Sequence, residues 1–170
     1  MSQKIGINVK IDPTAILEDQ IEIGDNTIIE AMSHLASGCK IGKNCRIHRN
    51  VFVDHNVRIG NNVKIQNNNS IYEGVTLEDG VFIGTNVSFT NDKYPRSINP
   101  DGTLKTGKDW TRSDTLISYG ASIGSGATIV CGITIGRAAM VGAGSVVTKS
   151  IADFMLAYGN PAIPQRSINL

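Results

Sequence analysis

Large apolar residues recur at every sixth position through the first half of the chain. The run starts at Ile5 and reaches Phe89 without a miss. A helix would repeat its apolar stripe every three or four residues, and a flat strand would alternate every two. A period of six instead predicts a short strand followed by a turn, repeated along the chain.

Two further positions of each hexad support this interpretation. Four residues after the large apolar residue most hexads carry a small or β-branched residue, such as Cys39 or Val51. Three residues after it stands Asn or Gly, with Thr14, Gln20 and Met32 as the exceptions. Asn and Gly enter positive φ at the least cost. We therefore expect a corner at this position, with one large and one small side chain from each hexad facing a narrow core.

Short strands separated by corners close most naturally into a triangular parallel β-helix in which three hexads make one coil. Residues 18 apart then stack on neighbouring coils. The rhythm stops after Phe89 and resumes at Ile117, an offset of 28 that is not a multiple of six. We predict one all-β domain over residues 1–170. It has about seven coils over 5–89 and 117–151, an inserted loop at about 90–116, and a short tail at 152–170.

These hexads resemble the hexapeptide-repeat acyltransferase family, whose signature is [LIV]-G-x-x-x-x. The resemblance implies a left-handed β-helix, although general crossover rules favour the opposite hand. It also implies a homotrimer with sites between subunits. A thin coil stack has flat faces and buries little surface alone, which agrees with assembly.

Composition narrows the function classes. The 16 Lys and Arg balance 15 Asp and Glu, so no global charge draws the chain to nucleic acid or to a membrane surface. No apolar run reaches the roughly 18 residues of a membrane span, and the N-terminus lacks the apolar core of a signal peptide. Cys39, Cys45 and Cys131 form no CxxC pair. We expect a cytoplasmic protein that binds neither nucleic acid nor membrane.

Counting by 18 brings His55, Glu73 and Asn91 into one column directly below the insertion. Polar residues line any such corner because corners face solvent, so the column alone does not define a site. The loop adds the single Trp110 and several basic residues, including Arg112, that could hold a diphosphate. Extended loops on rigid scaffolds are common carriers of binding residues.

Three stretches carry a more specific resemblance: QNNNSIYEGVTLEDGVFIG, FTNDKYPRS and ASIGSGATIVCGITIG. They are similar to the N-acetyltransferases that acetylate an amino group on a nucleotide-linked deoxy sugar or uronic acid in surface-polysaccharide biosynthesis. The resemblance implies acetyl-CoA as co-substrate, no metal, and an amino sugar of the dTDP-3-amino-3,6-dideoxyhexose type. It places Asn91 and Glu73 at the sugar amine, and His55 of the same column is the third catalytic candidate. Glu73, with or without His55, could take the proton, while Asn91 orients the amine.

The same resemblance supplies the binding candidates. For the nucleotide sugar they are Tyr94, Arg96, Asn67, Asn86 and Tyr72, and for coenzyme A they are Gly132, Ala139, Gly142, Lys149, Pro161 and Arg166. A backbone N–H such as that of Gly132 could also meet the oxyanion. Three departures from the family stand out: Asn69 replaces an inward valine, Ser118 and Tyr119 replace a more basic pair, and the tail reads NPAIPQR rather than NPAR.

Other functions stay open at this point. An O-acetyltransferase would need a firm base, which gives His55 more weight. A zinc-binding relative of the γ-class carbonic anhydrases would need three histidines, but His34, His48 and His55 occupy three different hexad positions without a close pair. A non-catalytic solenoid is the third alternative, and thiol release from acetyl-CoA separates it from the enzymes.

Overall fold

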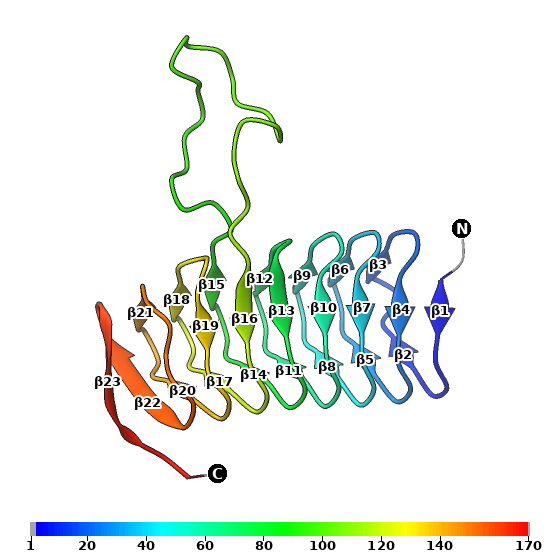
Figure 1. Ribbon diagram of the computed structural model, residues 1–170. Coiled ribbons are helices and arrows are strands. Elements are labelled where there is room, and N and C mark those ends of the chain that lie inside the picture. The colour runs from blue at the N-terminus through cyan, green and yellow to red at the C-terminus, as the bar shows by residue number, and fades with distance from the viewer. Residues whose placement is uncertain (1–2, 170) are drawn as a thin grey trace.

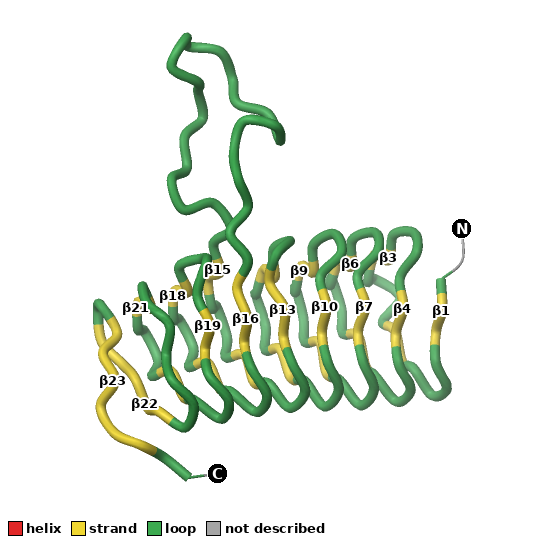
Figure 2. Tube along the Cα trace, viewed as in Figure 1, coloured by secondary structure: helices red, strands yellow, loops and turns green. Residues whose placement is uncertain are grey.

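The computed structural model describes residues 3–169 and folds them into three sheets that form the faces of a prism (Figures 1 and 2). Sheet A contains β1 (Lys4–Ile5), β4 (Glu22–Ile23), β7 (Lys40–Ile41), β10 (Arg58–Ile59), β13 (Val75–Leu77), β16 (Thr115–Ile117) and β19 (Thr134–Ile135). Sheet B contains β2 (Lys10–Ile11), β5 (Ile28–Ile29), β8 (Arg46–Ile47), β11 (Lys64–Ile65), β14 (Phe82–Ile83), β17 (Ser122–Ile123), β20 (Met140–Val141), β22 (Met155–Gly159) and β23 (Ala162–Ser167). Sheet C contains β3 (Ile16–Leu17), β6 (His34–Leu35), β9 (Phe52–Val53), β12 (Ser70–Ile71), β15 (Ser88–Phe89), β18 (Thr128–Ile129) and β21 (Val146–Val147).

Each coil takes one strand from each sheet, and β1 to β21 pair in parallel with the strand one coil away. The partners are 18 residues apart, as with Lys4 and Glu22, until the insertion lengthens the spacing to 40 between Val75 and Thr115. The coils wind in the left-handed sense (Figure 1). The predicted all-β parallel helix is therefore confirmed, with five coils before the insertion and two after it.

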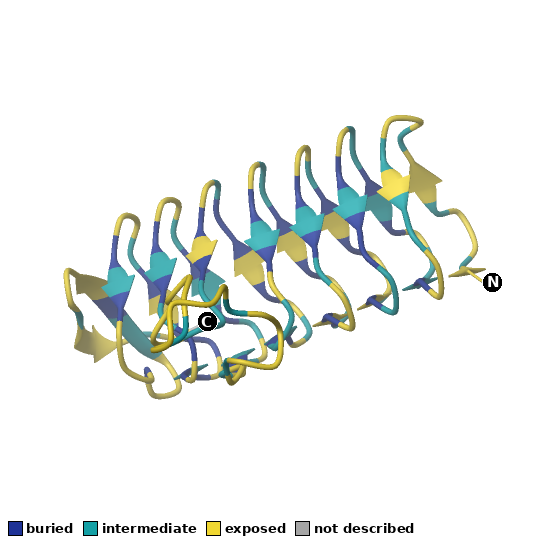
Figure 3. Ribbon diagram, turned by 90° about the horizontal axis from the view of Figure 1, so that it is seen from above, coloured by how far each residue is buried: buried dark blue, intermediate teal, exposed yellow. Residues whose placement is uncertain are grey.

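The core consists of the residues that the six-residue rhythm selects. From Ile23 to Phe89 and again from Ile117 to Val147 the large residues are buried, and the small residues four positions later are buried beside them. Buried positions repeat from coil to coil along the prism (Figure 3). Ile5 remains 42% exposed because no coil lies below the first one.

The corners adopt the backbone conformation that the Asn and Gly pattern predicts. Asn8, Asn26 and Asn44 have φ of 56°, 59° and 57°. Gln20 and Met32, two of the three exceptions, also take positive φ, at 58° and 60°. Coil stacking therefore imposes this conformation even on residues that do not favour it.

We refer to the three corners of the prism as edges. Edge AB consists of residues 6–8, 24–26, 42–44, 60–62, 78–80, 118–120 and 136–138. Edge BC consists of residues 12–14, 30–32, 48–50, 66–68, 84–86, 124–126 and 142–144. Edge CA consists of residues 18–20, 36–38, 54–56, 72–74, 90–114, 130–132 and 148–150, and it contains the insertion.

The inward amide of Asn69 finds the partners that its burial requires. Its side-chain Nδ2 donates to the carbonyls of Gln66 at 2.6 Å and Gly84 at 2.8 Å, and its Oδ1 accepts the N–H of Val87 at 2.8 Å. The residue is 1% exposed. The amide thus bridges two coils instead of disturbing them.

Two predicted boundaries need correction. The insertion ends at residue 114, because Thr115 and Leu116 already pair with Val75 and Thr76. The segment after residue 151 is no irregular tail: β22 continues sheet B beside β20, and β23 folds back antiparallel to it. Strand β22 pairs with β20, whose backbone groups would otherwise be unpaired at the end of sheet B.

The loop of residues 90–114 stands away from the coils (Figure 1). A single antiparallel bridge joins Ile98 to Leu104 within it. Among residues 3–169 no helix is long and apolar enough to cross a membrane.

Candidate functional site on edge CA

The strand register of sheet C stacks the corners of edge CA. Phe52 pairs with Ser70 and Ser70 pairs with Ser88, so the residues that follow these strands lie one above another. His55, Glu73 and Asn91 therefore occupy consecutive coils. The stacking follows from the 18-residue period, but what each side chain contacts differs along the column.

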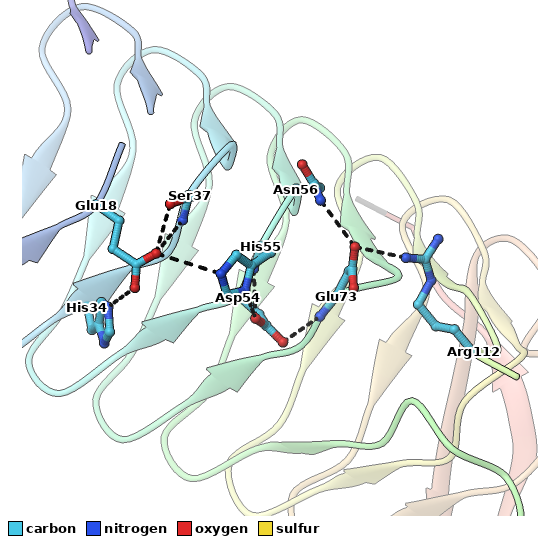
Figure 4. Close-up of polar contacts among 8 residues, drawn as sticks. All are labelled: Glu18, His34, Ser37, Asp54, His55, Asn56, Glu73 and Arg112. Carbon is cyan, nitrogen blue, oxygen red and sulfur yellow. Dashed lines mark hydrogen bonds and ion pairs between the residues drawn. The ribbon is translucent and has the colours of Figure 1, made fainter. Parts of the chain in front are cut away.

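Glu73 is the centre of a polar cluster (Figure 4). Its Oε1 lies 3.0 Å from a terminal guanidinium nitrogen of Arg112 and accepts a hydrogen bond from Asn56 Nδ2 at 3.2 Å. Its backbone N–H donates to Asp54 Oδ2 at 3.2 Å. The other carboxylate oxygen, Oε2, has no hydrogen-bond partner within residues 3–169. The side chain is 38% exposed, so the carboxylate is open to solvent.

Arg112 returns to edge CA where the loop rejoins the coils. Its Nε donates to Asp114 Oδ1 at 2.8 Å, and the carboxylates of Asp114 and Glu73 raise the pKa of the guanidinium. The side chain lies over Gly74, where a Cβ atom would come within 2.8 Å of Arg112 Cδ. Gly74 has φ of 95°, so glycine serves both the corner and this close approach.

Sequence reasoning listed Arg112 among the basic loop residues but did not pair it with Glu73. The two residues are 39 apart, a spacing that the 18-residue count does not reach. The phase of the resumed repeat held the signal. Counting back from Ile117 puts residues 112–114 at a corner, and β16 stacks directly on β13.

His55 belongs to a second group that lies toward the N-terminus (Figure 4). Its Nδ1 lies 2.8 Å from Asp54 Oδ1, and its Nε2 lies 3.7 Å from Glu18 Oε2. The hydrogen bond with Asp54 raises the pKa of His55. His55 therefore turns away from Arg112 and holds its proton to higher pH than a free imidazole.

Glu18 completes this second group. Its Oε2 accepts the backbone N–H and the hydroxyl of Ser37, both at 2.9 Å, and its Oε1 lies 2.8 Å from His34 Nε2. The hydrogen bonds from Ser37, with that from His34, lower the pKa of Glu18 to about 2. These contacts link Glu18 to residues of the next two coils.

A groove of about 380 Å³ lies on sheet A next to Glu73. Its floor is formed by β10, β13, β16 and β19, and its rim contains Asn56, Glu73, Arg112, Asp114 and Gly132. Neither His55 nor Asn91 lines it. The Asn91 side chain has no hydrogen-bond partner within residues 3–169. The backbone carbonyl of Asn91 accepts the N–H of Ser113 at 3.0 Å, which closes the base of the loop.

The predicted substrate-binding residues divide between two edges. Asn67 and Asn86 stack on edge BC, where the Asn86 N–H donates to the Asn67 carbonyl at 3.2 Å. Tyr72 lies on edge CA, with its ring packed edge-on against Phe52. Tyr72 and Asn86 share a shallow hollow on sheet C, not the groove beside Glu73.

The loop residues of this set lie apart from both hollows. Tyr94 is 78% exposed, Arg96 is exposed, and Asp92 Oδ1 accepts the Tyr94 N–H at 2.8 Å in a local turn. The structure of one chain does not bring Tyr94 or Arg96 to the groove.

The predicted coenzyme A residues are also dispersed. Gly132 lines the groove, and its N–H donates to Thr115 Oγ1 at 3.2 Å. Lys149 lies on edge CA, and Pro161 and Arg166 lie in the exposed hairpin. Gly142 is covered by Tyr158, whose Cβ lies 2.7 Å from where a Cβ on Gly142 would be.

Ala139 is a buried member of the predicted coenzyme A set. It is 1% exposed and packs in the core, so its side chain presents nothing to a cofactor. Its place in the hexad, four residues after Ile135, makes it one of the small inward residues of the repeat. No three His, Cys, Asp or Glu side chains gather into a group that could hold a metal ion in the part of the chain that the structure describes.

Comparison with known families agrees with the repeat. The model for the bacterial transferase hexapeptide (six repeats) matches residues 21–55 and 56–91, and the model for the hexapeptide repeat of succinyl-transferase matches residues 120–149. Together they cover most of the coils on both sides of the loop. The chain belongs to the hexapeptide-repeat proteins.

Individual relatives of the chain are named enzymes. The chain is 62% identical over 48 residues to the dTDP-3-amino-3,6-dideoxy-alpha-D-galactopyranose 3-N-acetyltransferase of Aneurinibacillus thermoaerophilus, covering 28% of this chain and 25% of that protein. It is 33% identical over 93 residues to a galactoside O-acetyltransferase of Lactococcus lactis, covering 52% of this chain and 44% of that protein. The matches thus span less than half the length of these curated relatives.

Among solved structures, a variant of AntD resembles this chain across most of its length. AntD is an N-acyltransferase from Bacillus cereus, crystallised with dTDP and coenzyme A. The TM-score is 0.60 at 20% identity, covering 98% of this chain and 84% of AntD. At this identity the likeness supports the fold.

Proposed function

We propose that this protein transfers an acetyl group from acetyl-CoA to the amino group of a nucleotide-linked amino-deoxy sugar. The observation that carries the proposal is the groove on sheet A at its border with edge CA. There a carboxylate with one unpaired oxygen lies beside an arginine at the root of the inserted loop. The high local identity to a dTDP-amino-sugar N-acetyltransferase supports the acceptor class. The acceptor we favour is a dTDP-3-amino-3,6-dideoxyhexose.

The chemistry requires a neutral amine. Its nitrogen attacks the thioester carbonyl, a C–N bond forms, the C–S bond breaks, and coenzyme A leaves as the thiol. Glu73 Oε2 is the group we assign to the amine proton, because it is unpaired and its carboxylate is open to solvent. In the structure the N–H of Gly132 donates to the hydroxyl of Thr115. It can therefore stabilise the oxyanion only after this hydrogen bond is broken.

We assign His55 and Asn91 different roles. His55 is engaged by Asp54 and lies off the groove, so we assign it to holding the edge rather than to proton transfer. Asn91 lies at the base of the loop with a free side-chain amide, which suits it to orient the amine. Tyr94 and Arg96 reach an acceptor only across a subunit interface or after movement of the loop.

We further infer that the protein works as a homotrimer. The outward side chains of sheet C include no Lys, Arg, Asp or Glu: they are Ile16, His34, Phe52, Ser70, Ser88, Thr128 and Val146. Sheet A by contrast carries Lys4, Glu22, Lys40 and Arg58 on its outer side. An uncharged face can be buried in an assembly at the lowest desolvation cost. Light scattering that gives the mass of a monomer contradicts this inference.

The buried, unpaired cysteines agree with a reducing compartment, and we propose a cytoplasmic enzyme that acts on sugars destined for surface polysaccharide.

Thiol release from acetyl-CoA tests the reaction. The assay pairs thymidine- and uridine-linked amino sugars with their hydroxyl counterparts, and compares wild type with Asn91→Ala and the edge AB control Asn62→Ala. We expect turnover with one amino sugar, a fall of at least about tenfold in Asn91→Ala, and an unchanged control. Release with the hydroxyl sugars alone supports the O-acetyltransferase alternative, which the relative from Lactococcus lactis favours. If none of the acceptors supports thiol release, acetyl transfer is contradicted.

A further inference from the structure

The groove beside Glu73 contains two guanidinium groups, of Arg58 and Arg112. Arg58 projects outward from β10 and is exposed. Within residues 3–169 it forms no ion pair, whereas Lys40, its neighbour one coil below, is paired with Glu22 at 2.9 Å. Sheet A thus leaves one arginine without a carboxylate at the point where the groove begins.

Arg112 is paired, but its partners are exchangeable. Its carboxylate partners Glu73 and Asp114 are 38% and 69% exposed. Ion pairs at such exposed sites contribute little net stability because water competes for both charges. A phosphate group offers the same planar fork a stronger, bidentate arrangement.

The local backbone keeps Arg112 in the groove even when its partners change. The side-chain stem lies against Gly74, and the Ser113 N–H is bonded to the Asn91 carbonyl at 3.0 Å. The guanidinium can therefore rotate away from Glu73 while its stem remains in place. Arg96 and Lys105 lie out in the loop and do not line the groove.

We propose that Arg58 and Arg112 form a subsite for a diphosphate group, and that its binding draws Arg112 from Glu73 to the anion. The inference rests on the proposed function and names the binding residues for that same site. The exchange leaves Glu73 Oε1 with Asn56 as its protein donor, so the carboxylate loses its guanidinium partner and becomes a stronger proton acceptor when a diphosphate is bound. Both the nucleotide sugar and coenzyme A carry a diphosphate, and the geometry fits this shared chemistry.

Calorimetric titration of the full chain tests the subsite without relying on turnover. The ligands come in two pairs that differ in their diphosphate-bearing part: dTDP against thymidine, and coenzyme A against pantetheine. The variants are Arg58→Gln and Arg112→Gln. The matched control is Arg46→Gln, an exposed outward arginine on β8 of sheet B that lies outside the groove.

We expect dTDP, coenzyme A or both to bind wild type more tightly than the partner without diphosphate. Both groove variants then lose at least tenfold in affinity for that ligand, while Arg46→Gln stays within twofold. Loss for dTDP alone assigns the subsite to the nucleotide sugar, and loss for coenzyme A alone assigns it to the acetyl donor. The proposal is overturned if wild type binds neither ligand, or if both groove variants bind like wild type.

The exchange of partners has its own test. Asp114→Asn frees the Nε of Arg112, so we expect it to tighten diphosphate binding several-fold. In an Arg112→Gln background the same change should give no gain, because the effect acts through that guanidinium. A gain that persists in this background means only that a repulsive charge was removed, and it contradicts the exchange.

The two proposals can fail separately. Acetyl transfer with unchanged binding in the arginine variants leaves the function standing without this subsite. Arginine-dependent diphosphate binding with no acetylated amine leaves the subsite standing without this function.

Discussion

Edges AB and CA occupy equivalent places in the coil, yet their residues and hydrogen bonds differ. On edge AB, Asn8, Asn26, Asn44 and Asn62 form a ladder in which each Nδ2 donates to the next Oδ1 at 3.3 Å. On edge CA the same position is Gln20, Gly38, Asn56 and Gly74, and the residues before it are Asp19, Ser37, His55 and Glu73. A regular edge repeats one interaction, whereas an edge that carries chemistry changes its residues from coil to coil.

In a solenoid of this kind, residues that depart from a repeated ladder are the candidates for function. The asparagine ladder supplies the positive φ and satisfies its own amides, so every rung has a sufficient structural explanation. Within residues 3–169, Glu73 on edge CA has one carboxylate oxygen without a hydrogen-bond partner, and Arg58 on the adjoining strand β10 has no carboxylate partner. The repeat is also interrupted on this edge, at residue 90. Departures from the ladder therefore indicate function better than the presence of polar residues does.

The largest effect on stability should come from the interior amide of Asn69. Asn69→Ala leaves the Val87 N–H and the Gly84 carbonyl without partners, and we expect a loss of about 3 kcal/mol in the free energy of unfolding. Urea denaturation measures it.

Asn69→Thr is the matched control. Thr27 makes the equivalent pair of bonds, donating to the Gly42 carbonyl at 2.8 Å and accepting the Cys45 N–H at 3.0 Å. Threonine should therefore recover most of the loss. Equal stability of the two variants contradicts the role of the bridge.

A rung of the ladder should have a smaller effect. Asn44→Ala puts a residue that disfavours the left-handed region at φ of 57° and removes two exposed amide contacts, so we expect a loss of about 1 kcal/mol. Asn44→Gly keeps the backbone unstrained and should lose less. Thermal unfolding gives both values. Thiol release should stay at the wild-type rate in each, and a clear fall would show that edge AB is not merely structural.

The smallest effect concerns His55 and depends on pH. The Asp54 hydrogen bond raises the pKa of His55, so its stabilising contribution is complete below the unfolded value of about 6.5 and is lost as pH rises through the folded pKa. The facing groups are Asp54, Glu18 and Glu73. The Tm difference between wild type and His55→Gln should shrink from pH 5.5 to pH 8.5. A Tm difference that grows as pH rises would contradict a stabilising role for protonated His55.

The period of six was enough to predict the coils, the core and the corners, because stacking forces every coil to reuse the same geometry. It also located the insertion and the column of His55, Glu73 and Asn91. It could not predict the Arg112 to Glu73 pair, since the insertion breaks the count between them. Nor could it predict the β22–β23 hairpin, whose pairing depends on the exposed edge of the last coil rather than on a repeat.

The direction of a side chain was the other limit. His55 and Glu73 are equivalent by counting, yet one turns toward Glu18 and the other toward Arg112. That choice is made by neighbours from adjacent coils, and a single period does not encode it.

We propose that edge CA performs acetyl transfer, whereas edge AB only stabilises the coils. The most direct test measures kcat for thiol release with the best amino-sugar acceptor in Glu73→Gln and in Asn62→Gly, with Tm measured in parallel. We predict that Glu73→Gln lowers kcat about 100-fold at nearly unchanged Tm, the range for loss of a general base. Asn62→Gly should lower Tm slightly and leave kcat within about twofold. Equal kcat in the two variants would contradict the division of labour between the edges.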